Sequence, residues 1–325
     1  MTLDELQEGF ESGEIEKSEN NFILYDRLIK IRDTILKYGE ENFYVSFSGG
    51  KDSTALSALI DMAIPENTIP RVYANTGIEY KMILDFVERE REREHPWELV
   101  IIKPSVSIKK MLEKEGYPFK SKQHADTVRR FQEKGMSKWV KFYLEEGYNW
   151  SRNRCPKILK YQFRDDWKGL KISDKCCMRL KEEPLKKWQE DHDKPYAIIG
   201  IMPDEGGRRA SAKCMAWKTK KRFNFQPLVP VTKEWENWFI VQYNIEICDI
   251  YKPPYNFDRT GCKGCPFNIH IQRELDVLKK YFPNERKQCE IIWKPVYDEY
   301  RRIGYRLKPL PKYEQIELML ETADT

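Results

Sequence analysis

The stretch that most constrains this chain runs from Phe43 to Ser53 and reads Phe-Tyr-Val-Ser-Phe-Ser-Gly-Gly-Lys-Asp-Ser. Its aromatic and β-branched first half predicts a short buried strand, and the apolar stripe from Thr54 to Met62 predicts a helix. The two glycines between them let the backbone approach an anion closely, while the start of a helix offers unpaired N–H groups and the positive end of its dipole. We therefore expect a strand, a phosphate-binding turn and a helix.

The polar residues of this turn supply what a nucleotide site needs. Lys51 adds a positive charge. Asp52 is a candidate Mg²⁺ ligand, because Mg²⁺ in nucleotide sites takes only one or two carboxylates together with the phosphates of the substrate. We predict Lys51 and Asp52 as catalytic residues. The predicted nucleotide contacts of this stretch are Ser46, Ser48, Gly49, Gly50, Lys51, Asp52 and Ser53.

Two known phosphate loops compete for this pattern. The P-loop, G-x-x-x-x-G-K-[ST], requires a glycine where this chain has Val45 and a hydroxyl where it has Asp52. The pattern S-G-G-x-D-S instead resembles the PP-loop of the ATP pyrophosphatases, which cleave ATP between the α- and β-phosphates and hold the released pyrophosphate. That resemblance implies ATP and Mg²⁺ as ligands. A turn that binds nothing is the alternative.

Length and composition indicate a globular chain with a full core. The 325 residues are 34% charged and 40% hydrophobic, which allows one large domain or two smaller ones. No stretch reaches the length of a membrane span, and Met1 to Lys17 is acidic and polar, unlike a signal peptide. We therefore expect a cytoplasmic protein without a membrane partner. The net charge of +5 is weak evidence for a polyanionic partner.

The order of predicted elements indicates the fold. Strands alternate with helices at the spacing of crossover connections, which predicts an α/β fold with a parallel twisted sheet and helices on both faces. Ligands of such sheets bind beyond the carboxyl ends of the strands. Thr76 and Gly77, which follow the second strand, are therefore predicted to face the same nucleotide site. The predicted strands are 43–47, 71–74, 98–102 and 196–201, and the predicted helices are 21–38, 54–62, 79–93, 105–115 and 232–243.

The remaining segments divide the chain into three predicted parts. An N-terminal helical segment covers 1–40, of which the part before the first helix is expected to be loose. A nucleotide-binding α/β domain covers 41–230, and a mostly helical region that runs to Glu321 fills 231–325. Residues 116–167 form a basic insertion that either covers the site or is plain solvated surface. After the strand at 196–201, a glycine-rich turn carries Arg208 and Arg209, which we predict as anion contacts.

A second constellation consists of the adjacent Cys176 and Cys177 and the C-x-x-C pair Cys262 and Cys265. Four thiolates from two places can form a tetrahedral metal site or hold an iron–sulfur cluster. The adjacent pair departs from the spacing typical of structural zinc sites, although Zn²⁺ stays an alternative. The other cysteines are expected to be small buried residues, with Cys155 the best candidate for an accessory thiol.

The residues around these cysteines resemble one family. Lys175-Cys-Cys-Met-Arg-Leu-Lys-Glu-Glu-Pro-Leu185 and Thr260-Gly-Cys-Lys-Gly-Cys-Pro266 are similar to the paired motifs of the PAPS reductase family. In its APS reductase branch, the two cysteine pairs together ligate one [4Fe-4S] cluster. The resemblance covers roughly Phe43 to Pro266 and implies an adenine nucleotide alpha-hydrolase-like fold. It also implies that Cys176, Cys177, Cys262 and Cys265 hold a [4Fe-4S] cluster.

Two departures from the reductases change the expected function. Their nucleophilic cysteine lies on a C-terminal tail, whereas this chain ends Glu-Thr-Ala-Asp-Thr325 and its last cysteine, Cys289, falls within a predicted helix. Their phosphate loop tends to be degenerate, whereas this one is complete. The combination resembles the sulfur-inserting members, such as the DNA phosphorothioation enzyme and certain tRNA thiolases.

This resemblance implies an ATP pyrophosphatase-type transferase that adenylylates an acceptor, releases pyrophosphate and uses the cluster in sulfur transfer. The implied partners are a small-molecule nucleotide, a nucleic-acid or other phosphate-bearing acceptor, and a sulfur-donor protein. Two alternatives stay open. One is an APS or PAPS reductase that produces sulfite with a different thiol, such as Cys155, and the other is a nucleotide- or nucleic-acid-binding module without turnover.

Overall fold

The computed structural model describes residues 1–145, 154–202 and 211–311. The chain forms two compact units that are interleaved along the sequence. The first, here called the sheet unit, comprises Met1–Asn75, Lys81–Lys103 and Glu183–Thr260. The second, here called the cysteine unit, comprises Thr76–Tyr80, Pro104–Glu182 and the chain from Gly261 onward. The three consecutive parts predicted from the sequence divide the chain differently, and their boundaries stay a prediction.

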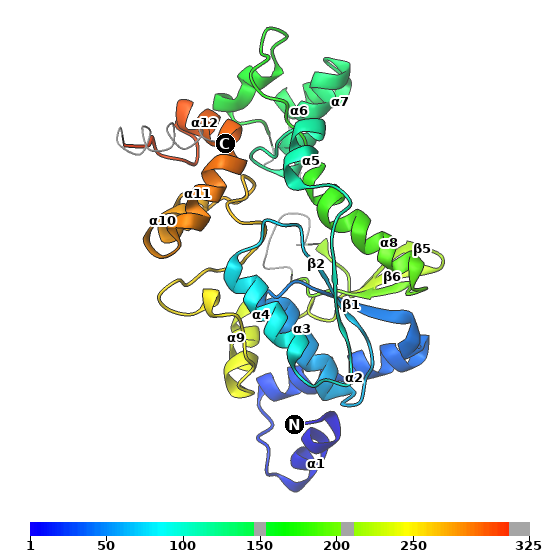
Figure 1. Cartoon of the computed structure of the whole chain (residues 1–325). Helices are drawn as coiled ribbons and strands as arrows, with labels where there is room; N and C mark the ends of the chain where they lie inside the picture. Colours follow the sequence, from blue (N-terminus) through cyan, green and yellow to red (C-terminus); the bar gives the residue numbers. More distant parts are fainter. Residues whose placement is uncertain (146–153, 203–210, 312–325) are drawn as a thin grey trace. The chain divides into compact units, whose positions relative to one another are not determined.

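The sheet unit is built on a six-stranded sheet with the order β3-β2-β1-β4-β6-β5 (Figure 1). All neighbouring pairs are parallel except β5 and β6, which form an antiparallel hairpin at one edge. The predicted parallel α/β sheet is therefore confirmed, whereas the hairpin was not predicted. The strands are β1 (Phe43–Phe47), β2 (Arg71–Ala74), β3 (Leu99–Ile102), β4 (Tyr196–Ile198), β5 (Met215–Thr219) and β6 (Arg222–Phe225).

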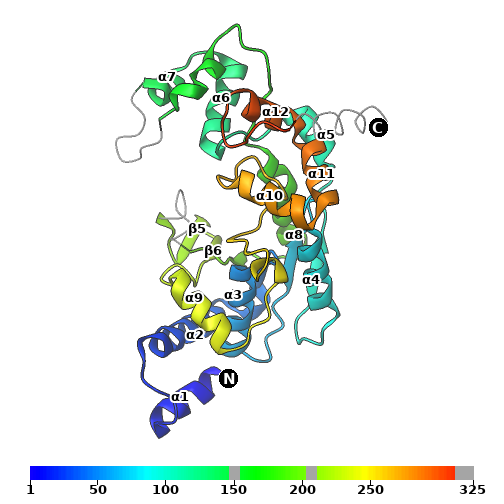
Figure 2. The ribbon, with the colours of Figure 1, turned by 90° about the vertical axis from the view of Figure 1, so that its left-hand side faces the viewer.

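Alternating side chains of β1 pack on opposite faces of the sheet. Phe43 and Val45 join the core cluster that contains α2 (Glu19–Tyr38), α3 (Lys51–Ala63) and α9 (Lys233–Gln242), and Figure 2 shows these three helices close together. Tyr44 packs on the other face against Trp188 of α8 (Glu183–Asp191). Because strand side chains alternate with a period of two, this pattern requires a helix layer on each face, as predicted. The sheet unit also contains α4 (Lys81–Glu92), η1 (Glu40–Asn42) and η6 (Asp249–Tyr251).

The expectation of a loose N-terminus is wrong, because residues Leu3–Ser12 form the helix α1. Thr2 and Glu5 form a capping box, in which each side chain accepts a hydrogen bond from the backbone N–H of the other. Leu3 and Leu6 are buried in the core cluster that includes α2. Cap and burial together stabilise a short helix that its own composition does not predict.

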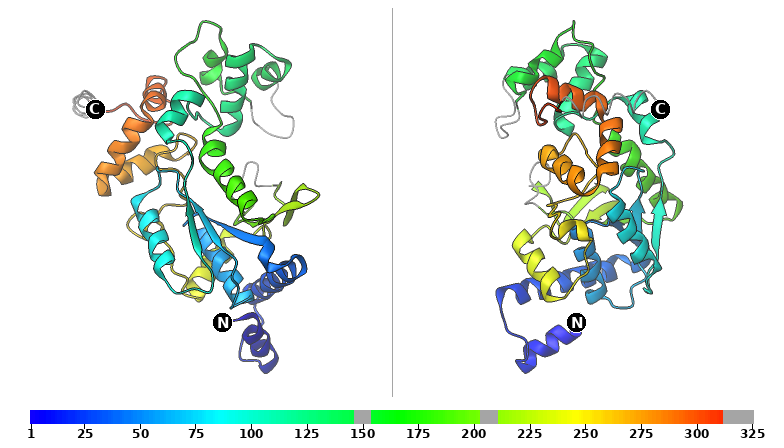
Figure 3. Two further views of the ribbon diagram at one scale, coloured as in Figure 1. Left: turned by 45° about the vertical axis from the view of Figure 1, so that its right-hand side comes forward. Right: turned by 60° about the vertical axis from the view of Figure 1, so that its left-hand side comes forward.

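The cysteine unit is helical (Figure 3). Residues 116–167, predicted as a basic insertion of helices and loops, contain two helices and a short 3₁₀ segment within 116–145 and 154–167. The predicted mostly helical C-terminal region is confirmed up to Arg302, and its expected continuation from 312 to 321 lies outside the described residues. The helices of this unit are α5 (Ile108–Glu115), α6 (Lys122–Lys134), α7 (Lys138–Glu145), η2 (Lys157–Phe163), η3 (Met178–Glu182), α10 (Ile271–Tyr281), α11 (Pro283–Ile292) and α12 (Lys294–Arg302). Within the described ranges, no helix combines the length and the apolar character needed to cross a bilayer.

Candidate functional site

The predicted phosphate turn lies at the carboxyl end of β1, where the strand order of the sheet reverses. The chain leaves β1 for β2 on one side, and only after β3 does it return to place β4 on the other side. This is the position at which open α/β sheets bind their ligands. Gly200, which follows β4, lies against the turn, since a Cβ atom there would be 3.0 Å from the backbone oxygen of Asp52.

Internal hydrogen bonds fix the shape of this turn. The hydroxyl of Ser53 accepts a hydrogen bond from the backbone N–H of Ser48 at 3.2 Å and donates to the carbonyl oxygen of Gly50 at 2.9 Å. Gly49 has φ +67°, and a Cβ atom there would be 2.8 Å from a methyl of Val87. Only glycine fits both constraints. The turn is therefore preformed, and Ser53 acts in building it.

Lys51, in the first turn of α3, is held by two carboxylates. Its ammonium forms an ion pair with Glu236 of α9 and lies 3.4 Å from Oδ1 of Asp52. The Glu236 side chain is 1% exposed, and among the described residues no group forms a hydrogen bond with its Oε1. Burial, and then the charge of Asp52, raises the pKa of Glu236 to about 7. Burial lowers the pKa of Lys51, but Glu236 and then Asp52 raise it, and the net shift is upward.

Sequence reasoning missed Glu236. It lies on the buried stripe of α9 together with Trp235, Phe239 and Ile240. A lone carboxylate at an apolar position of an amphipathic helix is the available signal, because a buried charge requires a partner. The structure supplies that partner from the phosphate turn.

The other predicted nucleotide contacts are placed as follows. Ser46 lies within β1, paired with Val72 of β2. Thr76 and Gly77 belong to the cysteine unit, and their backbone N–H groups, each at 3.1 Å, donate to the carboxylate of Glu79. These N–H groups are therefore already hydrogen-bonded to a carboxylate of the chain. That Thr76 and Gly77 share a site with the phosphate turn stays a prediction, and Arg208 and Arg209 lie outside the described residues.

The two cysteine motifs come together within the cysteine unit. A hydrogen bond with Cys177 raises the pKa of Cys176, and burial and the charges of Cys265 and Cys262 raise it further. The same hydrogen bond lowers the pKa of Cys177 to about 6. The Cys262 thiolate raises the pKa of Lys181 to about 12, so this cation also lies near the thiols. The charges of both motifs therefore act on one another, and that the four cysteines form one metal site stays a prediction.

The helices of the C-terminal region shape the C-x-x-C loop. Gly264 has φ +62°, and a Cβ atom there would be 2.7 Å from the sulfur of the buried Cys289. The hydroxyl of Tyr297 donates to the carbonyl oxygen of Gly264 at 2.5 Å, and the indole N–H of Trp293 donates to that of Lys263 at 2.9 Å. Trp293, between α11 and α12, and Tyr297 of α12 thus orient the loop that carries Cys262 and Cys265.

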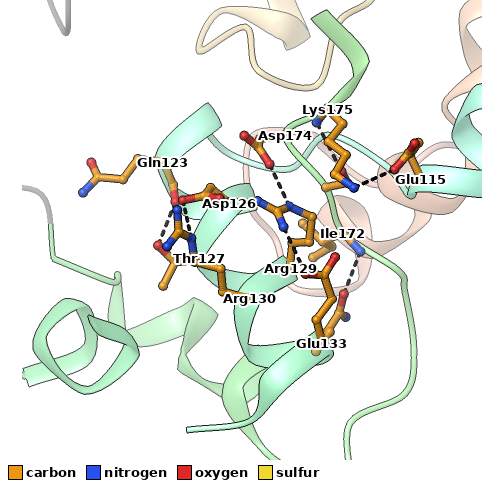
Figure 4. A network of polar contacts seen from close by, with 12 residues as sticks. Glu115, Gln123, Asp126, Thr127, Arg129, Arg130, Glu133, Ile172, Asp174 and Lys175 are labelled. Carbon is orange, nitrogen blue, oxygen red and sulfur yellow. Dashed lines mark hydrogen bonds and ion pairs between the residues drawn. The ribbon is translucent and has the colours of Figure 1, made fainter. Parts of the chain in front are cut away.

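Glu115, at the end of α5, holds the segment that carries the adjacent cysteines. Its carboxylate accepts a hydrogen bond from Nζ of Lys175 at 2.9 Å (Figure 4). It also accepts one from Nε of Arg179 at 3.0 Å, so the two donors lie on either side of the cysteine pair in the sequence. The hydrogen bond from Lys175 is the main cause that lowers the pKa of Glu115. The chain then continues into the π-helical segment η3, a geometry frequent at functional sites.

Arg129 and Arg130 of the predicted basic insertion are paired with carboxylates of the cysteine unit. Arg129 contacts Asp174 at 3.0 Å and Glu133 at 3.1 Å, and Arg130 contacts Asp126 at 2.9 Å (Figure 4). These ion pairs fix α6 against the chain before the cysteine pair. They favour the plain structural interpretation of this part of the insertion over an anion-binding one.

Two lysines and the cysteine of the insertion have different surroundings. Lys120 donates to the hydroxyl of Tyr143 at 3.4 Å, and Lys122 lies 3.4 Å from Glu182. Cys155 is buried, and burial raises the pKa of its thiol to about 12. At neutral pH this thiol stays protonated, which makes it a weak nucleophile.

The donor chemistry of the four cysteines fits a metal centre. Thiolates are the ligands of iron–sulfur clusters and of structural zinc, and the hydrogen bond with Cys176 lowers the pKa of Cys177 toward the thiolate form. Across residues 1–145, 154–202 and 211–311, however, no three His, Cys, Asp or Glu side chains adopt the arrangement of a metal site.

Comparison with known proteins identifies the family. A family model described as the phosphoadenosine phosphosulfate reductase domain matches residues 42–162 and 126–268, which is more than half of the chain. The chain belongs to this family. No curated protein matches the chain significantly.

Solved structures are similar at low identity. The PAPS reductase of Candida auris, in a phosphate complex, is 11% identical with a TM-score of 0.38, over 73% of this chain and 92% of that one. The FMN adenylyltransferase of Candida glabrata is 13% identical with a TM-score of 0.41, over 73% of this chain and 62% of that one. The NH3-dependent NAD synthetase of Campylobacter jejuni is 12% identical with a TM-score of 0.39, over 90% of this chain and 100% of that one.

Proposed function

We propose that this protein is an enzyme that binds ATP and Mg²⁺ at Ser48 to Ser53 and adenylylates an acceptor with release of pyrophosphate. The observation that supports this most is the complete turn Ser-Gly-Gly-Lys-Asp-Ser at the switch point of the sheet, with its backbone preformed and a lysine and an aspartate in the first turn of α3. Backbone N–H groups at the start of α3 would face the phosphates.

Lys51 and Asp52 have different proposed roles in this reaction. An oxygen of the acceptor attacks the α-phosphorus of ATP, the bond from that phosphorus to the bridging oxygen breaks, and pyrophosphate leaves with the bond electrons. Lys51 would stabilise the charge on the leaving pyrophosphate. Asp52 would hold Mg²⁺, which supplies Lewis-acid stabilisation of the phosphate oxygens when bound. Glu236 pairs with the Lys51 ammonium and raises its pKa, so it would hold this cation in place before ATP binds.

We assign Cys176, Cys177, Cys262 and Cys265 to a [4Fe-4S] cluster, with Zn²⁺ as the alternative. A cluster bound there would supply the redox or sulfur chemistry of a transfer step, in which AMP is displaced from the activated acceptor. Glu115 and the C-terminal aromatic residues would keep the four thiolates in place. The acceptor would be a nucleic acid or another phosphate-bearing molecule, and a donor protein would deliver the sulfur.

The test is pyrophosphate release from ATP by protein purified anaerobically, with nucleic-acid acceptors and a sulfide source. Release that disappears in Ser48→Ala and Asp52→Ala supports the proposal. Protein with an intact cluster that neither binds ATP nor releases pyrophosphate with any acceptor contradicts it. Iron and sulfide content with an absorption spectrum decides between the cluster and zinc.

A second candidate is a sulfonucleotide reductase, which the family match favours. It would require a nucleophilic thiol, and the burial and raised pKa of Cys155 argue against that residue. Sulfite production from APS or PAPS with a thiol reductant would support the reductase. Tight nucleotide binding without any turnover would instead favour a binding module.

A further inference from the structure

A basic groove runs between α8 and the β5–β6 hairpin of the sheet unit. It consists of two adjoining hollows of about 640 and 440 Å³, which share Gln189 and Glu190 of α8 and Lys220, Lys221 and Arg222 of the hairpin. The walls come from one helix and one hairpin of the same unit. The shape is therefore set by local packing.

The groove carries an excess of positive charge. Glu190 lies 3.0 Å from Arg222 and 3.9 Å from Lys186, so one carboxylate serves two cations. Lys218, Lys220 and Lys221 are exposed, and none of them forms an ion pair with any residue in the described ranges. The two hollows are lined by six cations and by two carboxylates, Glu190 and Asp193, so the excess of positive charge attracts a polyanion.

The turn of the hairpin that lines this groove and the phosphate turn lie at opposite ends of the parallel strands. The turn follows the carboxyl end of β1, whereas the hairpin turn at Lys220 and Lys221 precedes the amino end of β6, which runs parallel to β4 and β1. The groove is therefore separate from the proposed nucleotide site. Changes in it leave the residues of the phosphate turn in place.

We propose that this groove binds the phosphate backbone of a nucleic acid strand. Lysine ammonium groups are phosphate contacts, and neutral polar side chains such as Thr219 and Asn224, which also line the groove, supply the additional donors that such interfaces use. A strand that crosses from Lys186 past Lys218 to Lys221 would meet a cation on each wall. The proposal extends the proposed function by assigning a docking surface, and it does not depend on ATP chemistry.

The test uses the full chain and a triple variant, K218E/K220E/K221E. Fluorescence anisotropy measures binding of a labelled single-stranded oligonucleotide and of the matching duplex, without ATP, over a series of salt concentrations. The matched control, K17E/K30E/K37E, makes the same charge change at exposed lysines of the same unit. We expect the groove variant to lose binding at least about 30-fold and its salt slope to fall by about 2, while the control stays close to the wild type.

Several outcomes would overturn this inference. Equal losses in the two triple variants would mean that net charge alone governs binding. Binding of poly-glutamate or inorganic polyphosphate as tightly as of the oligonucleotide would assign the groove to a general polyanion site. ATP affinity is measured on the same samples. An unchanged ATP affinity with lost oligonucleotide binding supports the groove, whereas absent ATP binding in the wild type contradicts the proposed function and leaves the groove result standing.

Discussion

The phosphate turn and the cysteine site are built in different ways. The turn is formed by consecutive residues, and its shape depends on hydrogen bonds from Ser48 to Ser53. The cysteine site gathers two motifs far apart in the sequence, and its shape depends on residues outside both motifs, such as Glu115 and Trp293. The geometry of the turn is thus set by its own residues, whereas the geometry of the cysteine site is set by the helices around it.

The largest expected effect comes from removing the Asp52 carboxylate from the phosphate turn. We expect Asp52→Ala to lower pyrophosphate release from ATP by about 10²- to 10³-fold, since it removes the proposed Mg²⁺ ligand while the backbone of the turn remains. Steady-state pyrophosphate assays measure this. The control is Asp85→Ala, an exposed aspartate of α4 that pairs with Lys81. Equal rates for the two variants would remove Asp52 from the mechanism.

The next prediction concerns the cysteine site alone. We expect Cys262→Ser to reduce bound iron to less than about a tenth of the wild-type content, because serine oxygen is a poor replacement for a thiolate ligand. The matched control is Cys214→Ser, a half-buried cysteine of the sheet unit outside both motifs. Iron and sulfide analysis after anaerobic purification gives the answer. If Cys214→Ser loses as much iron as Cys262→Ser, the assignment of ligands fails.

Glu236 is the exception to the local character of the phosphate turn, because it connects Lys51 to the distant helix α9. Its pKa in the folded chain is about 7, against 4.5 for an ordinary glutamate, so the folded state holds its proton more tightly than the unfolded state. The stability that this provides is present below pH 4.5 and is lost as the pH rises to 7. Between these pH values, the free energy of unfolding of the wild type should fall by up to about 3 kcal/mol relative to that of Glu236→Gln, as measured by urea unfolding. Parallel pH profiles of the two proteins would contradict the shift.

The smallest expected effect concerns the support of the cysteine site. Glu115→Gln weakens the contacts to Lys175 and Arg179, and we expect about a tenfold loss in metal affinity, as is typical when a residue that orients a metal ligand is changed. ATP binding should stay unchanged. The control, Glu113→Gln, alters an exposed residue of the same helix. If Glu115→Gln loses ATP binding but keeps its metal, Glu115 supports the phosphate turn and not the cysteine site, which contradicts this account.

The sequence predicted local features better than long-range ones. β1 and β2 match the predicted limits of 43–47 and 71–74, because apolar runs bounded by turn residues define them. The β5–β6 hairpin was missed, because its turn, Lys220-Lys221, lacks the glycine or asparagine that marks hairpins. Glu236 was missed because its partner, Lys51, is far away in the sequence.

Nucleotide preference tests the central claim most directly, since it needs no acceptor. Titration calorimetry with Mg²⁺ compares ATP, inorganic pyrophosphate, APS and PAPS on the anaerobically purified chain and on Ser48→Ala. The account predicts that ATP binds most tightly, that pyrophosphate competes with it, and that Ser48→Ala weakens both. Tight binding of APS or PAPS with sulfite release, and none of ATP or pyrophosphate, would contradict it.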